Sequence, residues 1–367
     1  MKTIYRFLFA GGGTGGHLYP AVAVAQQIKM IKPESEILFI GAKGKMESRI
    51  VPKLGFNFKS IWISGFTRKF SIDNILFPLK LLVSLSQSLF YCIKFHPQVA
   101  IGSGAYVSGP VIWSASILGS RILLMEQNSY PGLTNRLLEK KADQIHITFE
   151  DSKNYFRDKS KLKLSGNPVR INLELIDKSV ALEKFQLSNA KKTLLILGGS
   201  GGALSINEAV KNNLINLLEK NIQIIWQTGS FYFERYKHLN SADVKVVPFI
   251  DDMAVAYSAA DLLVARAGAT TIAEASYLGL PVIFVPSTNV AANHQYKNAI
   301  TLKNNDAAEI VEDSQVNQKI VDKIMEIIFD ENKLKSFSQN IKKFSKPNAA
   351  KNIALDAIKL AETFNRD

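Results

Sequence analysis

The sequence predicts an α/β protein made of two doubly wound domains. Its 367 residues exceed the size at which one hydrophobic core keeps growing, so two domains are expected. Short, unalternating apolar runs recur between helical stretches, which is typical of a parallel sheet covered by helices on both faces. The order strand, glycine-rich turn, helix occurs near the start and again near Lys192. We therefore expect two Rossmann-like domains that face each other across a cleft.

The first series of elements begins with a buried strand at Ile4–Ala10, a glycine loop and a helix from Pro20 to about Lys32. Its further strands are expected at Ile37–Ile40, Val99–Ile101, Ile122–Met125 and Gln144–Phe149. The second series is expected to have strands at Thr193–Leu197, Ile222–Trp226, Val244–Val247, Leu262–Val264 and Val282–Val285, with a helix from about Ser205 to Lys220. We place the domains at residues 1–168 and 169–345, and expect a C-terminal helix at about 346–367 to pack back on the first domain.

Composition limits the partners and the compartment. The net charge of +13 favours an anionic partner, which composition alone leaves open between nucleic acid, an acidic membrane surface and a phosphate-bearing substrate. The single cysteine, Cys92, excludes an intramolecular disulfide and a cysteine-rich metal cluster, and suits a reducing compartment. Arg6 interrupts the apolar start, which we interpret as a strand and not as a signal peptide. The most apolar helix, Leu81–Ile93, is too short to span a bilayer.

The first glycine loop, Gly11–Gly16, matches the G-x-G-x-x-G pattern of dinucleotide sites. Such sites also need an acidic residue at the end of the second strand to hold a ribose. Here that strand ends in Ile40–Lys43 without an acid, although Lys43 and Lys45 could suit a 2′-phosphate, so NADP stays open. A turn made only for packing is the other alternative.

Two further glycine loops point to a phosphate-rich ligand. Gly102–Tyr106 follows another strand of the first series, and Gly198–Gly202 opens the second. Ser200 could donate its hydroxyl and N–H to a phosphate at the start of the next helix. One such loop is commonly a simple turn, but three after three strands are hard to explain by packing alone.

His17 directly follows the first glycine loop and is the candidate catalytic base. A lone histidine is more often structural or solvated. At a helix N-terminus, however, the helix dipole favours the neutral imidazole, which can take a proton near neutral pH.

The segment Arg266–Glu274 is the candidate nucleotide site. A helix that starts near Ala269 would turn free N–H groups toward a diphosphate, and Glu274 could accept hydrogen bonds from two ribose hydroxyls. The alternative for Glu274 is an acid that complements the helix dipole. Asn293–Gln295 could contact sugar hydroxyls or be a solvated loop. Since the chain lacks Asp-x-Asp, we expect no obligatory metal, and transfer from a nucleotide sugar needs no other cofactor.

Six motifs, in order and at matching spacing, resemble those of the MurG family of bacterial N-acetylglucosaminyltransferases. They are Gly12–Pro20, Tyr106–Pro110, Glu126–Asn128, Gly166–Arg170, Phe249–Met253 and Gly268–Glu274. The resemblance implies a GT-B fold, with acceptor and membrane functions in the first domain and UDP-sugar binding in the second. It also implies an inverting transfer of N-acetylglucosamine from UDP-N-acetylglucosamine to the 4-hydroxyl of the muramoyl residue of lipid I, which gives lipid II.

The family's functional residues carry over onto matching positions. His17 would be the base, with Glu126 in reserve. Asn128 and Gln295 would contact the sugar, Arg170 and Ser200 the diphosphate, and Ile250 the uracil through its backbone. The full set of substrate contacts is Thr14, Gly15, Gly16, Asn128, Arg170, Ser200, Ile250, Ala269, Thr270, Thr271, Ile272, Ala273, Glu274 and Gln295. The family pattern is not matched at Met125, Ala267, His294 and Gly201. We expect none of these departures to be disabling, because the backbone contacts survive, although they could shift affinity or sugar selectivity.

The stretch Ile61–Phe95 combines apolar and basic residues. It is either an ordinary half-buried helix or a patch that enters an anionic leaflet. A lipid-linked acceptor favours the patch, so we expect a peripheral enzyme on the cytoplasmic face of the plasma membrane. Its expected partners are UDP-N-acetylglucosamine, lipid I, anionic lipids and a cell-wall synthesis complex, without nucleic acid. Rival functions are another UDP-sugar transferase or epimerase, a nucleotide-sensing module and an NADP-dependent reductase.

Overall fold

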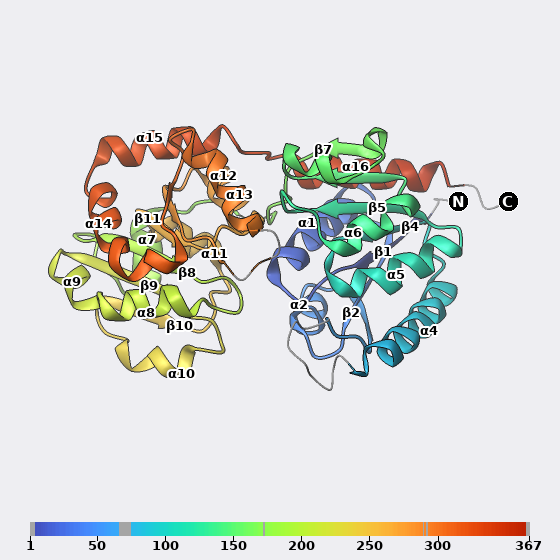
Figure 1. Cartoon of the computed structure of the whole chain (residues 1–367), viewed down its shortest axis with the longest axis horizontal. Helices are drawn as coiled ribbons and strands as arrows, with labels where there is room; N and C mark the ends of the chain where they lie inside the picture. Colours follow the sequence, from blue (N-terminus) through green and yellow to red (C-terminus); the bar gives the residue numbers. More distant parts are fainter. Residues whose placement is uncertain (1–3, 66–74, 172, 289, 291–292, 365–367) are drawn as a thin grey trace. The chain divides into compact units, whose positions relative to one another are not determined.

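The computed structural model describes residues 4–65, 75–171, 173–288, 290 and 293–364 (Figure 1). It forms two compact units: unit 1 is Met1–Ile171 with Lys346–Asp367, and unit 2 is Asn172–Ser345. Each unit has one parallel sheet flanked by helices, which confirms the predicted α/β class. The division after Ile171 lies just beyond the predicted boundary at residue 168 and leaves Arg170 in unit 1.

Unit 1 contains a seven-stranded sheet in the order β3-β2-β1-β4-β5-β6-β7. Its strands are β1 (Arg6–Ala10), β2 (Glu36–Ala42), β3 (Asn57–Ile61), β4 (Val99–Gly102), β5 (Arg121–Glu126), β6 (Gln144–Ile147) and β7 (Leu162–Leu164). Its α-helices are α1 (Gly15–Ile31), α2 (Met46–Lys53), α4 (Phe77–Phe95), α5 (Ala105–Ile117), α6 (Leu133–Leu138) and α16 (Ala349–Glu362). The chain order reverses between β1 and β4, where Ala10 pairs with Gly102, and a crevice for ligands is expected at such a switch point.

The alternation of side chains along β1 builds both halves of the unit 1 core. Phe7 and Phe9 pack in a cluster with α1 and α16, whereas Leu8 and Ala10 belong to the cluster beneath α5. The C-terminal helix α16 therefore packs on α1, as Figure 1 shows. Helix α1 begins at Gly15, earlier than the predicted start at Pro20, because the two glycines at its start adopt helical geometry.

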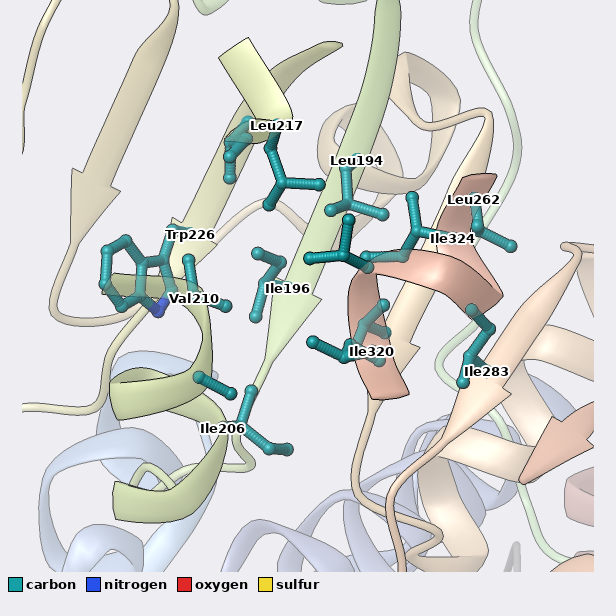
Figure 2. Packing of buried hydrophobic residues seen from close by; sticks show 14 of the residues in the cluster. Leu194, Ile196, Ile206, Val210, Leu217, Trp226, Leu262, Ile283, Ile320 and Ile324 are labelled. Carbon is teal, nitrogen blue, oxygen red and sulfur yellow. The ribbon is translucent and has the colours of Figure 1, made fainter. Parts of the chain in front are cut away.

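Unit 2 contains a six-stranded sheet in the order β10-β9-β8-β11-β12-β13. Its strands are β8 (Lys192–Leu197), β9 (Ile222–Gln227), β10 (Val244–Val247), β11 (Leu262–Ala265), β12 (Val282–Phe284) and β13 (Glu309–Ile310). Its α-helices are α7 (Lys178–Lys184), α8 (Leu204–Asn212), α9 (Leu214–Glu219), α10 (Phe233–Tyr236), α11 (Met253–Ala259), α12 (Ala269–Leu278), α13 (His294–Lys303), α14 (Val316–Ile328) and α15 (Glu331–Lys342). Figure 2 shows Ile196 of β8 packed among Trp226 of β9, Val210 of α8 and Ile324 of α14.

The single helix predicted at about Ser205–Lys220 is wrong in one respect, because it is broken into α8 and α9. Asn213 lies at the break with φ −109° and ψ 9°. Its side-chain Nδ2 donates to the carbonyls of Ala209 at 2.8 Å and Asn317 at 3.2 Å. An asparagine amide that bonds to nearby backbone in this way competes with helical geometry.

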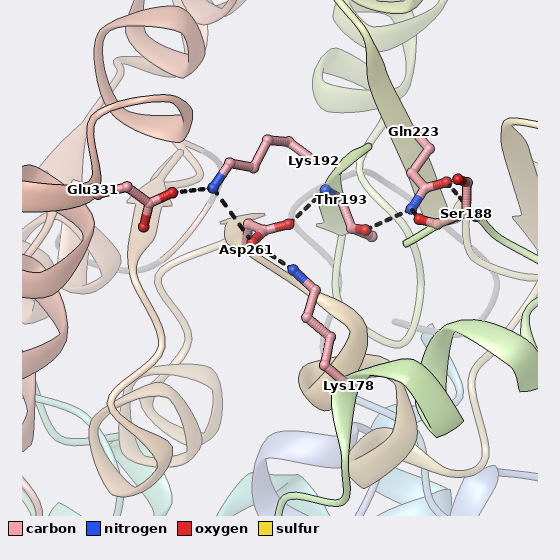
Figure 3. A network of polar contacts seen from close by, with 7 residues as sticks. All are labelled: Lys178, Ser188, Lys192, Thr193, Gln223, Asp261 and Glu331. Atoms are coloured by element: carbon pink, nitrogen blue, oxygen red, sulfur yellow. Dashed lines mark hydrogen bonds and ion pairs between the residues drawn. The ribbon is translucent and has the colours of Figure 1, made fainter. Parts of the chain in front are cut away.

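A polar network supports the amino end of the unit 2 sheet (Figure 3). Asp261 accepts from the Thr193 N–H at 2.7 Å and pairs with Lys178, and Lys192 bridges Asp261 and Glu331. Because the strands are parallel, this network lies at the sheet edge opposite the glycine loop that follows β8. It therefore belongs to the frame of unit 2, not to the binding edge.

Candidate active site

The first glycine loop, between β1 and α1, is held by a buried carboxylate that the sequence did not single out. Glu47, on α2, is 1% exposed. Its two oxygens accept from the N–H groups of Gly13 and Ala42, each at 2.9 Å. An acid therefore does lie beside this loop, but its oxygens bind backbone N–H groups, which weighs against a ribose contact of the dinucleotide kind.

His17 lies in the first turn of α1, and its ring is tied to two other loops. Its Nδ1 lies 2.8 Å from the carbonyl oxygen of Ser103 and 3.0 Å from Oε1 of Gln127. A carbonyl oxygen can only accept, so Nδ1 must carry the proton. In the neutral ring, Nε2 then holds a lone pair, as a general base requires.

Glu126, the reserve candidate for the base, is fully engaged at the end of β5. Its oxygens accept from the N–H of Asn128 at 2.9 Å, the N–H of Gly132 at 3.0 Å and Nδ2 of Asn135 at 2.8 Å. Burial raises the pKa of the Glu126 carboxyl above its usual range, while these donors act in the opposite direction. The contacts make Glu126 an anchor for the loop that carries half-buried Asn128.

Arg170 lies against helix α1, in unit 1. Its guanidinium carbon lies 4.0 Å from the ring centroid of Tyr19, which is within cation–π distance. Tyr19 follows His17 by about half a turn of α1. Thr14, the N-cap of this helix, and Gly16 are exposed, whereas Gly15 is buried. Unit 1 thus gathers the loop residues, His17 and Arg170 around the start of one helix.

The second-half glycine loop is locked to its neighbour by close backbone contact. Gly202 has φ 79°, and a Cβ there would lie 2.1 Å from the carbonyl oxygen of Thr228. Gln227 then links two predicted site elements, since its Nε2 donates to the Gly199 carbonyl at 3.2 Å and its Oε1 accepts from the Ile250 N–H at 2.9 Å. Ser200 is half-buried in this loop. The Ile250 N–H is therefore engaged within unit 2.

Helix α12 begins where the sequence predicts, directly after Gly268. In the part of the chain that the structure describes, its first turn has no acidic side chain and no side-chain cap. Its N-terminal N–H groups and helix dipole therefore suit an anion. Ala269 and Ile272 are buried, whereas Thr270, Thr271 and Ala273 are half-buried.

Glu274, on α12, is buried, with 3% of its surface exposed. Its Oε2 accepts from the hydroxyl of Tyr257 at 2.7 Å. Tyr257 lies on α11, 17 residues before Glu274, and nothing in the sequence pattern marked it. The tyrosine orients the carboxylate that was predicted to bind a ribose.

Gln295 and Arg266 are the last two predicted site residues at the carboxyl edge of the unit 2 sheet, which we call the unit 2 edge. Gln295 stands at the start of α13 and accepts through Oε1 from the Ser287 N–H at 2.8 Å. Arg266 pairs with Asp313 at 2.6 Å and donates to the Val285 carbonyl at 3.0 Å. Arg266 thus supports the turn that precedes α12. Among the described residues there is no cluster of side chains that could hold a metal ion.

Comparison with known proteins assigns the family. Residues 7–147 match the glycosyltransferase family 28 N-terminal domain, and residues 193–353 match its C-terminal domain. A protein of Flavobacterium psychrophilum named UDP-N-acetylglucosamine–N-acetylmuramyl-(pentapeptide) pyrophosphoryl-undecaprenol N-acetylglucosamine transferase is 44% identical over 362 residues, which cover 98% of each chain.

Solved structures agree with this assignment. The Acinetobacter baumannii MurG crystal structure is 26% identical, with a TM-score of 0.72 over 97% of this chain and 99% of that one. A putative UDP-N-acetylglucosamine 2-epimerase from Listeria monocytogenes shares the fold alone, at 11% identity and a TM-score of 0.69 over 100% and 99%. The chain therefore belongs to glycosyltransferase family 28 and, within it, to the MurG family.

Proposed function

We propose that this chain is an inverting hexosyltransferase that moves N-acetylglucosamine from UDP-N-acetylglucosamine to the 4-hydroxyl of the muramoyl residue of lipid I, forming lipid II. The observation that carries the proposal is the bond from His17 Nδ1 to the Ser103 carbonyl. It leaves Nε2 of His17 as a proton acceptor beside a glycine loop, in a chain of the MurG family. The names of its relatives support the donor and the acceptor.

The reaction follows from a single displacement. Nε2 of His17 takes the proton of the acceptor 4-hydroxyl as the oxygen attacks C1 of N-acetylglucosamine. The bond from C1 to the diphosphate oxygen breaks with inversion, so the product is β-linked and UDP leaves as the anion. The α12 N-terminus, Ser200 and Arg170 stabilise the charge that develops on the diphosphate.

The donor contacts follow from the unit 2 edge. Glu274 binds the ribose hydroxyls, and the first turn of α12 binds the diphosphate. Because the Ile250 N–H already donates to Gln227, the Ile250 carbonyl is the backbone group that accepts from the uracil. Thr14, Gly15, Gly16, Asn128 and Gln295 contact the sugar and its neighbouring phosphate.

We further propose that unit 1 docks on anionic lipids at the cytoplasmic face of the plasma membrane. The exposed face of helix α4 supports this proposal. Its buried positions are Lys80, Ser84, Ser88 and Cys92, whereas a stripe at Leu79, Leu82, Phe90 and Ile93 is exposed. A helix that buries small and polar residues and exposes apolar ones is suited to an apolar partner surface.

Two details refine this docking surface. The predicted patch residues Phe66, Arg68, Lys69, Phe70 and Asp73 lie outside the described residues. Lys80, which lies in the same stretch and counts toward its basic character, is buried: its Nζ lies 5.7 Å from the Trp62 ring centroid and donates to Ser64. Among the described residues, no helix is both long and apolar enough to cross a membrane.

Transfer of labelled N-acetylglucosamine to a lipid I analogue tests the proposed function. We expect product from UDP-N-acetylglucosamine and much less from UDP-glucose. Thermal shifts with UDP-N-acetylglucosamine and NADPH add a check, because a ligand at 100 times its Kd stabilises the folded protein by about 2.7 kcal/mol. Epimerisation of the donor without transfer, or a shift with NADPH alone, would contradict the proposal.

A further inference from the structure

We propose that Gln127 is a positioning residue for His17: its amide oxygen keeps the ring proton on Nδ1 and so keeps Nε2 available as the base. The inference rests on the proposed function, in which His17 takes the acceptor proton. Gln127 belongs to the Glu126–Asn128 motif, in which the flanking residues were assigned roles and Gln127 was not.

The contacts define one tautomer of His17. Gln127 Oε1 and the Ser103 carbonyl both approach Nδ1, at 3.0 and 2.8 Å. A proton on Nδ1 is shared between these two acceptors, whereas a lone pair there would face two oxygens and be repelled. The two oxygens together therefore favour the tautomer that leaves Nε2 unprotonated.

The orientation of the Gln127 amide follows from the same argument. If the amide were turned over, its NH2 group would face the Nδ1–H of His17, which is itself a donor. In the orientation with Oε1 toward His17, Gln127 Nε2 is buried and has no hydrogen-bond partner among the described residues. Buried polar groups without partners are rare and often mark function. The contact with His17 is thus kept although it leaves the Nε2 group unsatisfied.

Packing and charge around the ring complete the site. Gly104 has φ 91°, and a Cβ there would lie 3.0 Å from Nδ1 and Cε1 of His17, so the glycine lets this loop approach the ring. Glu126, which adjoins Gln127 at the end of β5, interacts electrostatically with His17. The loop after β4 contributes the uncharged Ser103 carbonyl. Gln127 is therefore an uncharged side chain in contact with His17, and replacing it changes how strongly the ring holds its proton on Nδ1.

The test is the pH dependence of kcat for two variants of the full chain. Gln127→Glu places a carboxylate against Nδ1–H, which stabilises the imidazolium form of His17. We therefore expect the acid limb of the kcat–pH profile to move to higher pH by about one unit. Gln127→Leu removes one of two acceptors, so we expect kcat to fall about tenfold with both KM values within about twofold. Gln98→Glu is the matched control, since Gln98 bonds to Arg6 at the other end of the sheet and should leave the profile unchanged.

A second measurement does not depend on how the variants fold. The ring nitrogen chemical shifts of His17, identified by their loss in His17→Ala, report the tautomer of the unaltered protein. We expect the Nδ1–H form; the Nε2–H form, or an unmoved acid limb in a folded Gln127→Glu variant, overturns the inference. Failure of the proposed function looks different, because the unaltered chain would then transfer no sugar or His17→Ala would keep its turnover.

Discussion

Buried glutamates hold the binding loops of this molecule. Glu47 holds the first glycine loop and Glu126 holds the loop that carries Asn128, each through backbone N–H donors. Glu274 is held by the hydroxyl of Tyr257. Hydrogen bonds to a carboxylate are about twice as strong as neutral ones and compensate for its burial. Two of these carboxylates therefore position backbone, while Glu274, the proposed ribose ligand, is itself oriented by a side chain.

Removing the Tyr257 hydroxyl tests this positioning. Without it, the Glu274 carboxylate can adopt other rotamers, and each binding event must order it. We expect Tyr257→Phe to raise the KM for UDP-N-acetylglucosamine about tenfold, or about 1.4 kcal/mol, with kcat within about twofold. Steady-state kinetics at saturating acceptor measure the change. Tyr277→Phe, on the same helix as Glu274, is the control, and equal effects of the two substitutions would contradict the prediction.

At the scale of elements, the loops of unit 2 are held by close contact between backbone segments as well as by side chains. Gly202 combines a left-handed backbone with contact to the Thr228 carbonyl, whereas a Cβ at Gly201 would meet nothing within 4 Å. The two positions adjoin in one loop, so they form a matched pair.

We expect Gly202→Ala to destabilise unit 2 by about 1–3 kcal/mol, because the new Cβ forces the loop away from Thr228 and strains φ. Gly201→Ala should change stability by less than about 0.5 kcal/mol. Urea unfolding followed by the fluorescence of Trp226, which is buried in unit 2, measures both. A stable Gly202→Ala variant with wild-type donor affinity would show that the close approach is dispensable.

The burial of each strand explains which elements could be predicted from the sequence. Central strands such as β1 and β8 are buried on both faces and appear as continuous apolar runs. The edge strand β3, with alternating burial, and the short strands β7 and β13 give no such run and were not predicted. Glycine loops and helix starts were visible because local chemistry defines them. Glu47, Gln127 and Tyr257 were missed because their contacts arise only in the folded structure and leave no local pattern in the sequence.

At the scale of the whole molecule, one buried histidine ties the C-terminus to unit 1. His146 of β6 lies 2.7 Å from Ser165 Oγ through Nδ1 and 3.6 Å from Asp356 of α16 through Nε2. Burial lowers the pKa of His146 to about 4; Lys163 adds to this, while Asp356 opposes it.

This depressed pKa predicts a loss of stability in acid. The unfolded histidine, with a pKa near 6.5, binds its proton first, so stability present above that pH is lost as the pH falls toward 4. We expect His146 to account for about 2 kcal/mol of unfolding free energy lost between pH 7 and pH 5. His146→Gln should remove that part of the pH dependence in urea titrations. The exposed His238 is the control, and a slope unchanged by His146→Gln would contradict the prediction.

At the scale of the whole molecule, the proposed docking on a membrane assigns the contact to one face of helix α4. Phe90 and Leu82 of α4 are 61% and 65% exposed, and burying each in a leaflet is worth roughly 1.5–3 kcal/mol. We expect Phe90→Glu to weaken binding to vesicles containing an anionic phospholipid at least about tenfold, because it removes apolar area and adds a repelled charge. Flotation with vesicles measures this, and transfer to a water-soluble acceptor analogue should stay within about twofold of the unaltered protein.

Ile215→Glu, at a residue 74% exposed in unit 2, is the matched control. Equal loss of binding in both variants would mean that net charge, and not the α4 face, attaches the enzyme to its lipid surface.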